Sequence, residues 1–236
     1  MKKVIIIGAT SGIGRELAKL FAKDDWLVGV TGRRIALLDS LQQEFPKHIF
    51  TESFDVTGNS NILHLEKLIR ILGGLDLIIY NSGYGDPSDE LDWEIEKKTT
   101  LTNVNGFIEI ITHAYNYFIK LGHGHIVGIS SIAANRGNHH APAYSASKAF
   151  MSTYLEGLSI KGSKRNIIVT DIQPGFIKTK MAKGNKQFWV SAVDKATKQI
   201  YQAILGKKRK VYITRRWWII AKLIKWLPYP VLKRFM

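Results

Sequence analysis

The 236-residue sequence contains no cysteine, which excludes disulfide bonds, thiolate nucleophiles and metal–thiolate sites. Long hydrophobic runs are missing as well. Two lysines open the chain as in a signal peptide, but the apolar run that follows, Val4–Ile7, ends at once in a glycine-rich loop. We therefore expect a buried strand at this position and a cytoplasmic protein.

Repeats and low-complexity tracts are also absent, and hydrophobic residues make up 45% of the sequence. A chain of this length and composition fits one globular α/β domain with a substantial core.

Acidic residues are absent from residues 207–236, a segment that contains ten basic residues. This tail accounts for most of the formal net charge of +15. Such an excess suggests an anionic partner. We expect one domain over residues 1–213 and a basic, aromatic extension over residues 214–236.

Short apolar runs bounded by turn residues alternate with longer segments of helical spacing. Several runs are apolar at consecutive positions, as strands covered on both faces should be. This alternation predicts an α/β fold with a doubly wound parallel sheet and helices on both faces, whose ligands bind beyond the carboxyl ends of the strands. The expected strands are residues 3–7, 26–30, 48–54, 75–80, 125–130, 166–172 and 209–213.

The first expected strand is followed by the segment GATSGIG, which opens a helix at Arg15. Glycines let the backbone approach a pyrophosphate closely, and the amides and dipole of a helix N-terminus bind its charge. The alternative is a mere tight turn, but the position between the first strand and the first helix favours a dinucleotide site. The expected contacts in this loop are Gly8, Thr10, Ser11, Gly12, Ile13 and Gly14.

The second expected strand ends in the segment VTGRR. A fold that selects NAD usually places Asp or Glu here to bind the ribose hydroxyls, whereas the 2′-phosphate of NADP needs cations. Gly32 occupies the acidic position, and Arg33 and Arg34 follow it. The segment therefore favours NADPH. The alternative is that the two arginines are merely solvated at a helix start, although cations there oppose the helix macrodipole.

The segment AYSASKAF places Tyr144 and Lys148 about one helical turn apart, within side-chain reach of each other. Taken alone, the pair has a plain alternative, in which the tyrosine packs on the core and the lysine extends to water.

Together and in this order, the motifs resemble the short-chain dehydrogenase/reductase family over nearly all of the chain from Lys3 to about Ile213. The family signature TGxxxGIG is matched at its three glycines, with Ile7 where the family commonly has threonine. The segment NSG resembles the family's NAG, with Ser82 in place of alanine. The resemblance implies a Rossmann-type fold and extends the set of cofactor contacts to Arg33, Arg34, Asp55, Val56, Asn81, Ser82, Gly83, Tyr144, Lys148, Pro174, Gly175, Ile177 and Thr179.

The resemblance also implies four catalytic residues, Asn103, Ser131, Tyr144 and Lys148. Relatives usually place the catalytic serine thirteen positions before the tyrosine, which selects Ser131 over Ser130. Tyr144 would give a proton to the substrate oxygen, while the charge of Lys148 would lower the tyrosine pKa and the lysine would hold the nicotinamide ribose. Ser131 would hydrogen-bond the substrate oxygen, and Asn103 would position a water that relays protons to Lys148.

We therefore expect an NADPH-dependent oxidoreductase that reduces a ketone or aldehyde, with an apolar or lipid-like keto compound as one candidate substrate. Two alternatives stay open: oxidation of an alcohol with NAD(P), which would use the same residues, and a noncatalytic dinucleotide-sensing protein, against which the complete catalytic set argues. No metal site is expected, because the adjacent residues His139 and His140 should point apart and have no ligand cluster around them. The substrate depends on the variable stretch after Thr179 and cannot be read from the sequence.

The tail after Ile213 extends beyond the point at which many relatives finish. If residues 215–227 are helical, the expected apolar stripe is Trp217, Ile220, Leu223, Ile224 and Leu227, with Arg215, Lys222 and Lys225 opposite. The run is too short and too basic to span a bilayer. Aromatic and basic residues together suit a helix that lies on an anionic membrane surface, which would place the protein peripherally on the inner face of a membrane.

The alternative for the tail is that its stripe packs on this subunit or on a second one. Relatives commonly assemble through helices equivalent to residues 142–162 and 191–205, so we expect a homodimer or homotetramer. Nucleic acid is not an expected partner, because no recognition motif accompanies the charge.

Overall fold

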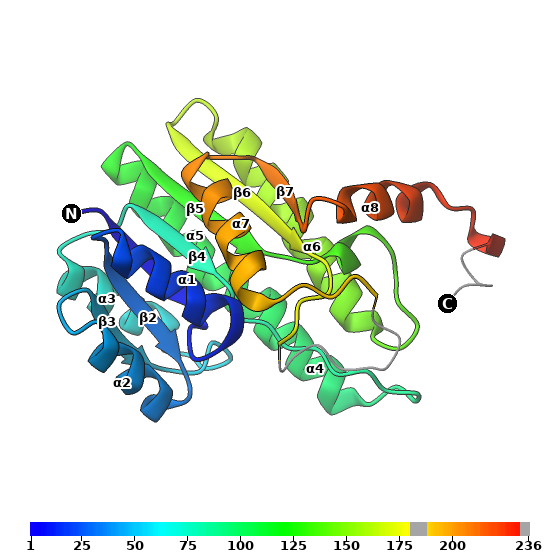
Figure 1. Cartoon of the computed structure of the whole chain (residues 1–236), viewed down its shortest axis with the longest axis horizontal. Coiled ribbons are helices and arrows are strands. Elements are labelled where there is room, and N and C mark those ends of the chain that lie inside the picture. The colour runs from blue at the N-terminus through cyan, green and yellow to red at the C-terminus, as the bar shows by residue number, and fades with distance from the viewer. Residues whose placement is uncertain (180–187, 232–236) are drawn as a thin grey trace.

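The computed structural model describes residues 1–179 and 188–231. At its centre lies a seven-stranded parallel sheet with the strand order β3-β2-β1-β4-β5-β6-β7 (Figure 1). The strands are β1 (Lys3–Ile7), β2 (Leu27–Gly32), β3 (Ile49–Ser53), β4 (Leu77–Tyr80), β5 (Gly124–Ile129), β6 (Ile167–Pro174) and β7 (Lys210–Ile213). The predicted sheet is confirmed, with all seven strands in their expected places and their ends shifted by at most two residues.

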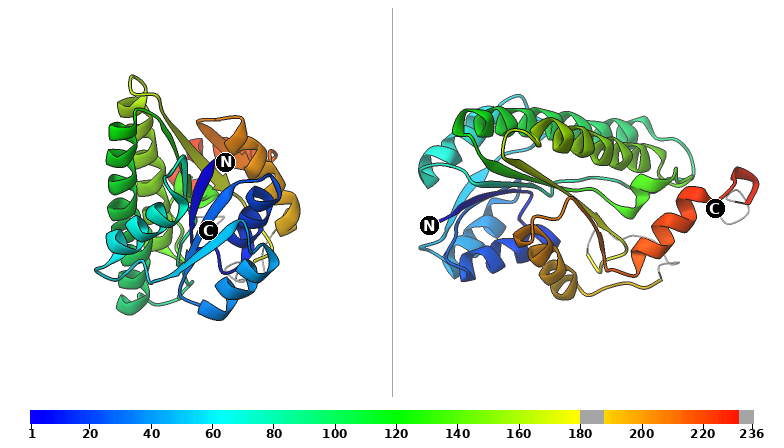
Figure 2. Two further views of the ribbon diagram at one scale, coloured as in Figure 1. Left: turned by 90° about the vertical axis from the view of Figure 1, so that its left-hand side faces the viewer. Right: turned by 90° about the horizontal axis from the view of Figure 1, so that it is seen from above.

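Two helical layers cover the sheet, one on each face (Figure 2). One layer contains α1 (Gly12–Lys23), α2 (Ile35–Glu44) and α7 (Val193–Leu205). The other contains α3 (Asn61–Leu72), α5 (Gly106–Leu121) and α6 (Pro142–Gly162). The described residues also form α4 (Trp93–Thr100), which leads through a π-helical turn at Leu101–Asn105 into α5, a short 3₁₀ helix at Ile132–Asn135, and α8 (Trp217–Trp226).

Strand β1 shows why its sequence is apolar at consecutive positions. Val4 and Ile6 are fully buried in the core cluster under α1 and α7, whereas Ile5 and Ile7 are fully buried in the cluster under α3, α5 and α6. Successive side chains of a strand point to opposite faces, so a strand between two helical layers has no polar side.

The order in which strands are added to the sheet reverses at β1, which pairs with β2 on one side and with β4 on the other. In a doubly wound sheet, such a switch point opens a crevice beyond the carboxyl ends of the two central strands. The loops after β1, β2, β4, β5 and β6 all leave from this edge, and α8 follows β7 at the same edge (Figure 1).

Helix α8 begins at Trp217 and ends at Trp226, inside the expected range of 215–227. None of the described helices is both long enough and apolar enough to cross a membrane.

Candidate active site

Tyr144 and Lys148 lie on the first turns of α6, which begins at Pro142, a residue whose fixed φ suits the start of a helix. Lys148 is only 3% exposed. Its Nζ donates a hydrogen bond to the carbonyl oxygen of Ile129 at 2.9 Å and lies 5.8 Å from the centroid of the Tyr144 ring. The plain alternative, a lysine that extends to water, is therefore wrong.

Burial dominates the protonation of this pair. It raises the pKa of the Tyr144 phenol, and the Ser131 side chain acts in the opposite direction. Burial also lowers the pKa of Lys148 to about 8, against the upward effect of the Asp171 carboxylate. The expected lowering of the tyrosine pKa by Lys148 is not found, because the ammonium is directed to the end of β5.

Ser130 and Ser131, which follow β5, face different neighbours. The Ser131 side chain hydrogen-bonds the Tyr144 phenol and lowers its pKa. Its Oγ also accepts a hydrogen bond from the Ala133 amide at 3.1 Å. Ser130 instead donates to the Asp171 carboxylate on β6. The structure therefore brings Ser131, and not Ser130, to the tyrosine, as the thirteen-residue spacing predicts.

Asn103 lies in the π-helical turn between α4 and α5 and is fully buried. Its Nδ2 donates to the Tyr84 carbonyl at 2.8 Å and to Ser147 Oγ at 2.9 Å, while its Oδ1 accepts from the Tyr84 amide at 2.8 Å. This side chain ties the loop after β4 to α6, one residue before Lys148. The geometry gives Asn103 a positioning role; the water relay expected of it stays a prediction.

The glycine loop after β1 has the shape that a pyrophosphate requires. Gly8 and Gly12 have φ values of +88° and +59°, which side chains rarely adopt. A Cβ at Gly14 would lie 2.2 Å from the Gly8 carbonyl oxygen, so only glycine allows α1 to begin this close to the strand. Ser11, the residue before α1, makes no capping hydrogen bond to the described residues, which leaves the first amides of the helix for an anion.

Other segments with expected cofactor contacts converge on this loop. Asn81 donates to the Gly8 carbonyl at 2.6 Å, and Ser82 lies so close that a Cβ at Gly8 would meet its Oγ at 2.6 Å. From the loop after β6, the Thr179 methyl lies 3.4 Å from the place of a Cβ at Gly12. The elements that follow β1, β4 and β6 thus meet around one backbone turn.

The remaining expected contacts lie in the same loops. Gly83 follows Ser82 in the loop after β4, and Ile13 is partly buried on the core under α1. Pro174 is the last residue of β6 and is buried, as is Ile177 in the segment that follows. Gly175 is closed off on one side, because its Cβ would lie 2.1 Å from the Trp217 indole.

Two arginines stand at the end of β2. The Arg33 guanidinium lies 3.3 Å from the Asp55 carboxylate, whereas Arg34 donates from its Nη2 to Ser11 Oγ at 2.8 Å and from its Nε to Thr10 Oγ1 at 3.2 Å. Both arginines thus have partners at the carboxyl edge of the sheet, where the cofactor contacts are expected. The alternative of merely solvated arginines is wrong for Arg34.

Asp55 follows β3 and is held as a carboxylate. Burial alone would raise its pKa, but hydrogen bonds from Thr57 and the charge of Arg33 together keep that pKa below its ordinary value. Val56 is buried next to it, and its carbonyl accepts from Asn61 Nδ2 at 3.0 Å. The described geometry keeps Asp55 charged next to Arg33.

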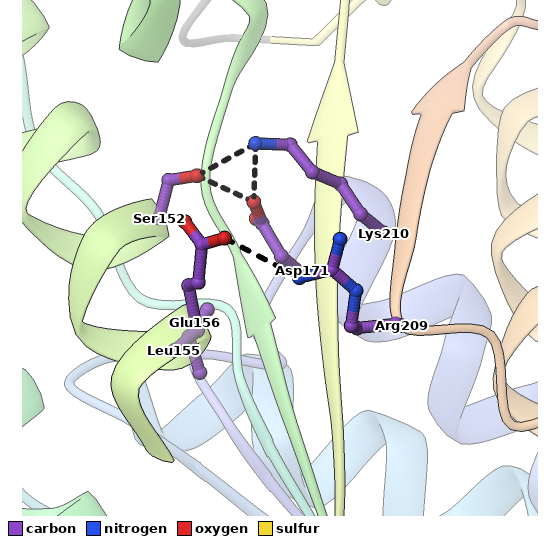
Figure 3. Close-up of a pocket in the computed structure, with 6 residues that line it drawn as sticks. All are labelled: Ser152, Leu155, Glu156, Asp171, Arg209 and Lys210. Atoms are coloured by element: carbon purple, nitrogen blue, oxygen red, sulfur yellow. Dashed lines mark hydrogen bonds and ion pairs between the residues drawn. The ribbon is translucent and has the colours of Figure 1, made fainter. Parts of the chain in front are cut away.

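Asp171 is a buried carboxylate that the sequence analysis missed. It is 4% exposed and accepts a hydrogen bond from Gln173 Nε2 at 3.0 Å. It also accepts a hydrogen bond from Ser152 Oγ at 2.6 Å and lies 3.6 Å from Lys210 Nζ (Figure 3). The cavity beside it holds about 10 Å³, which suffices for one water molecule and excludes a substrate. An acid inside the apolar run NIIVTDI was the signal for this site.

Gly85 was also missed. A Cβ at this position would lie 2.3 Å from Cδ2 of Tyr144, so the loop after β4 reaches the tyrosine ring only because residue 85 is glycine. No sequence signal beyond the glycine itself marks this contact.

The rings of His139 and His140 lie close together, with 3.7 Å between their centroids, so the expectation that they point apart is wrong. They occupy a turn and not a regular element, which removes the reason for that expectation. His140 Nδ1 lies 3.7 Å from Asp89. The described residues contain no group of three histidines or carboxylates that could hold a metal ion.

Comparisons with known proteins bear on the family and the fold of this chain. The family model of the short chain dehydrogenases matches residues 2–188. An uncharacterized oxidoreductase of Myxococcus xanthus is 34% identical over 190 residues, which cover 78% of this chain and 75% of that protein. Carbonyl reductase family member 4 of Xenopus laevis is 31% identical over 191 residues, 79% of this chain and 80% of that protein.

Among solved structures, ElxO with NADP bound superposes with a TM-score of 0.81. The match covers 92% of this chain and 99% of ElxO at 22% sequence identity. At this identity the likeness concerns the fold.

Proposed function

The chain belongs to the short-chain dehydrogenase family and is an oxidoreductase of that family; from this premise we propose that it uses NADPH to reduce a ketone or aldehyde to an alcohol. The observation that carries the proposal is the buried set around Tyr144, in which Ser131 acts on the phenol and Lys148 lies one helical turn away.

The residues at the cofactor edge fit a dinucleotide with a 2′-phosphate. Glycines with positive φ and uncapped helix amides fit the pyrophosphate, and Arg33 and Arg34 supply cations at the end of β2. At Gly32 a Cβ would lie 2.5 Å from the Thr10 methyl, so an acid that binds ribose hydroxyls would displace Thr10. A shared fold alone does not choose between NADPH and NADH, so the preference rests on these residues.

The chain's own side chains would handle the proton. Burial favours the protonated phenol of Tyr144, the form that can donate to a substrate oxygen. The Ser131 hydroxyl would hydrogen-bond that oxygen as negative charge develops on it. Lys148, with its pKa lowered to about 8, is mostly charged at neutral pH and would hold the nicotinamide ribose. When bound, the nicotinamide would supply the hydride.

An apolar or lipid-like keto compound is the substrate class that we favour. Aromatic rings gather beside Gly175, with centroids 5.4 Å apart for Phe176 and Trp217, 5.1 Å for Phe188 and Trp217, and 6.1 Å for Trp189 and Trp217. This cluster would favour an apolar chain next to the reacting carbonyl. Most of the stretch after Thr179 that was expected to shape the substrate pocket, residues 180–187, lies outside the described residues.

Tyr144→Phe tests the proposal. The variant should lose most NADPH-dependent turnover in a panel of ketones and aldehydes, because the phenol is the proton donor, while its affinity for NADPH stays nearly unchanged. Tyr154→Phe on the same helix is the matched control, because among the described residues the Tyr154 hydroxyl hydrogen-bonds only Thr112, at 3.2 Å. Full turnover by Tyr144→Phe would refute the assigned role.

A further inference from the structure

Helix α8 has one face on the domain and one face in solvent. Trp217 and Ala221 are 2% and 1% exposed, so the inner face is part of the protein core. Leu223, which was expected in the same stripe, is 61% exposed, and this part of the prediction is wrong. The exposed apolar side chains on the other side, which we call the outer apolar face, are Trp218 (49% exposed), Ile219 (52%), Leu223 (61%) and Trp226 (81%).

Specific contacts hold α8 in this orientation. Arg136, in the loop after Ser131, donates from its Nε to the Ile224 carbonyl at 3.0 Å and from its Nη2 to the Leu227 carbonyl at 2.7 Å. These bonds satisfy carbonyl groups at the C-terminal end of the helix, which would otherwise need water. At the other end of α8, Trp217 packs against Gly175. Helix α8, which carries the outer apolar face, is therefore anchored at both ends, and it follows β7 at the carboxyl edge of the sheet (Figure 1).

Positive charge surrounds this face. Lys222 and Lys225 are exposed on α8, and the Lys222 ammonium lies 4.2 Å from the centroid of the Trp218 ring. The sequence has no acidic residue from Lys195 to its end. Exposed tryptophans intermixed with lysines are typical of helices that lie at the boundary between lipid headgroups and acyl chains.

A cationic groove lies where α7 and the start of α8 meet. It has a volume of about 440 Å³, and its lining includes Lys195, Arg215 and Arg216. Thr214 also lines it; this residue is 8% exposed, and its hydroxyl has no hydrogen-bond partner among the described residues. Three cations at one groove suit a phosphate group.

A second copy of the chain fits this surface poorly. A symmetric dimer through the outer apolar face would bring the same cations of both copies together, and this part of the sequence offers no acid to neutralise them. An anionic surface is complementary to them.

We propose that the outer apolar face of α8 docks on an anionic phospholipid membrane, with Trp218, Ile219, Leu223 and Trp226 at the acyl boundary and the groove residues on lipid phosphates. The helix is too short to cross the bilayer, so the protein lies on the surface. Because α8 is hydrogen-bonded to the loop that follows Ser131, docking brings the active-site edge of the sheet to the membrane. The docking itself does not depend on the proposed reaction.

Cosedimentation of the full chain with vesicles tests the proposal. Vesicles of phosphatidylcholine with phosphatidylglycerol should bind the protein at low salt, and 0.5 M salt should weaken binding about tenfold or more because it screens the lysines and arginines. Vesicles of phosphatidylcholine alone should bind it weakly. Failure to bind the anionic vesicles at low salt would overturn the proposal and leave the cations for a protein or nucleic-acid partner.

Variants with matched controls separate the two components of binding. Leu223→Ser with Trp226→Ser should lower vesicle affinity about tenfold with little change in melting temperature, because both side chains are exposed. Trp93→Ser is the control, since Trp93 is an exposed tryptophan on α4 (70% exposed). This variant should bind vesicles as the native protein does. Equal affinity of the α8 variant and the Trp93 control would overturn the proposal.

A second pair of variants tests the contribution of charge to vesicle binding. Lys222→Gln with Lys225→Gln should lower affinity for anionic vesicles and reduce the salt dependence. Lys161→Gln with Lys164→Gln removes two exposed lysines near the end of α6 and should change neither. Equal losses in the two double variants would show attraction by net charge alone and would likewise overturn docking through α8. Carbonyl reduction measured without vesicles should stay unchanged in all of these variants, which keeps this test apart from that of the proposed reaction.

Discussion

Replacing Arg33 with alanine should weaken the binding of NADPH and leave that of NADH nearly unchanged. The Arg33 side chain is 60% exposed and lies 3.3 Å from the Asp55 carboxylate. A hydrogen bond to a charged group contributes about 1.5–3 kcal/mol. Since Arg33 is exposed and shared with Asp55, the lower end applies, and about 1.5 kcal/mol corresponds to a roughly tenfold higher Kd for NADPH.

Arg34 provides an informative contrast, because its guanidinium is bound to the glycine loop through Thr10 and Ser11. Arg34→Ala should remove a phosphate ligand and also loosen the loop that holds the pyrophosphate. The Kd of both cofactors should therefore rise, with a larger change for NADPH.

Fluorescence titration of the native protein and both variants with NADPH and NADH measures these effects. Arg70→Ala on α3 is the control, since Arg70 is exposed and lies outside the loops after β1 and β2. Equal Kd values for the two cofactors in the native protein would refute the assignment of NADPH. A Kd for NADH that rises as much as that for NADPH in Arg33→Ala would refute the assigned role of Arg33.

Three further predictions concern protons and assembly. Because burial lowers the pKa of Lys148 to about 8, activity should fall as pH rises through about 8. The Asp171 carboxylate raises this pKa, so Asp171→Asn should shift the decline to lower pH, and an unchanged pH profile of kcat/KM would contradict this prediction. Burial lowers the pKa of His125 from 6.5 to about 4. The neutral ring therefore contributes stability that is fully present above pH 6.5 and is lost as pH falls towards 4, and the loss is about 3 kcal/mol at most. His125→Gln should flatten this pH-dependent decline in the free energy of unfolding measured in urea. Light scattering at micromolar concentration should give the mass of a dimer or tetramer, and a monomer mass would rule out the expected assembly through α6 and α7.

The sheet could be predicted because its central strands, such as β1 and β4, lie between two helical layers and are apolar for that reason. The same topology made the glycine loop and the segments after β4, β5 and β6 predictable as neighbours, since the carboxyl ends of parallel strands meet at one edge. The pairing of Asp171 with Ser152 could not be predicted in this way. It depends on which side chains of β6 and α6 face each other, and that is decided by the packing of two elements and by no local pattern.

The protonation of the catalytic pair shows a second limit. A spacing of four residues predicts that Tyr144 and Lys148 share a helical face, but the direction of a lysine ammonium depends on the nearest acceptor. Here that acceptor is the Ile129 carbonyl at the end of β5, a backbone atom whose position only the folded sheet defines.

Helix α8 shows how an apolar stripe can be assigned to the wrong side chains. Trp217 and Leu223 were expected in one stripe, yet of these two only Trp217 is buried, because a separation of six residues places them about 120° apart around a helix. Trp217 packs on the backbone of Gly175. The Gly175 amide also donates to the Ile213 carbonyl at 2.6 Å, immediately before the tail begins. The segment expected to line the nicotinamide and the base of α8 are thus one packed unit.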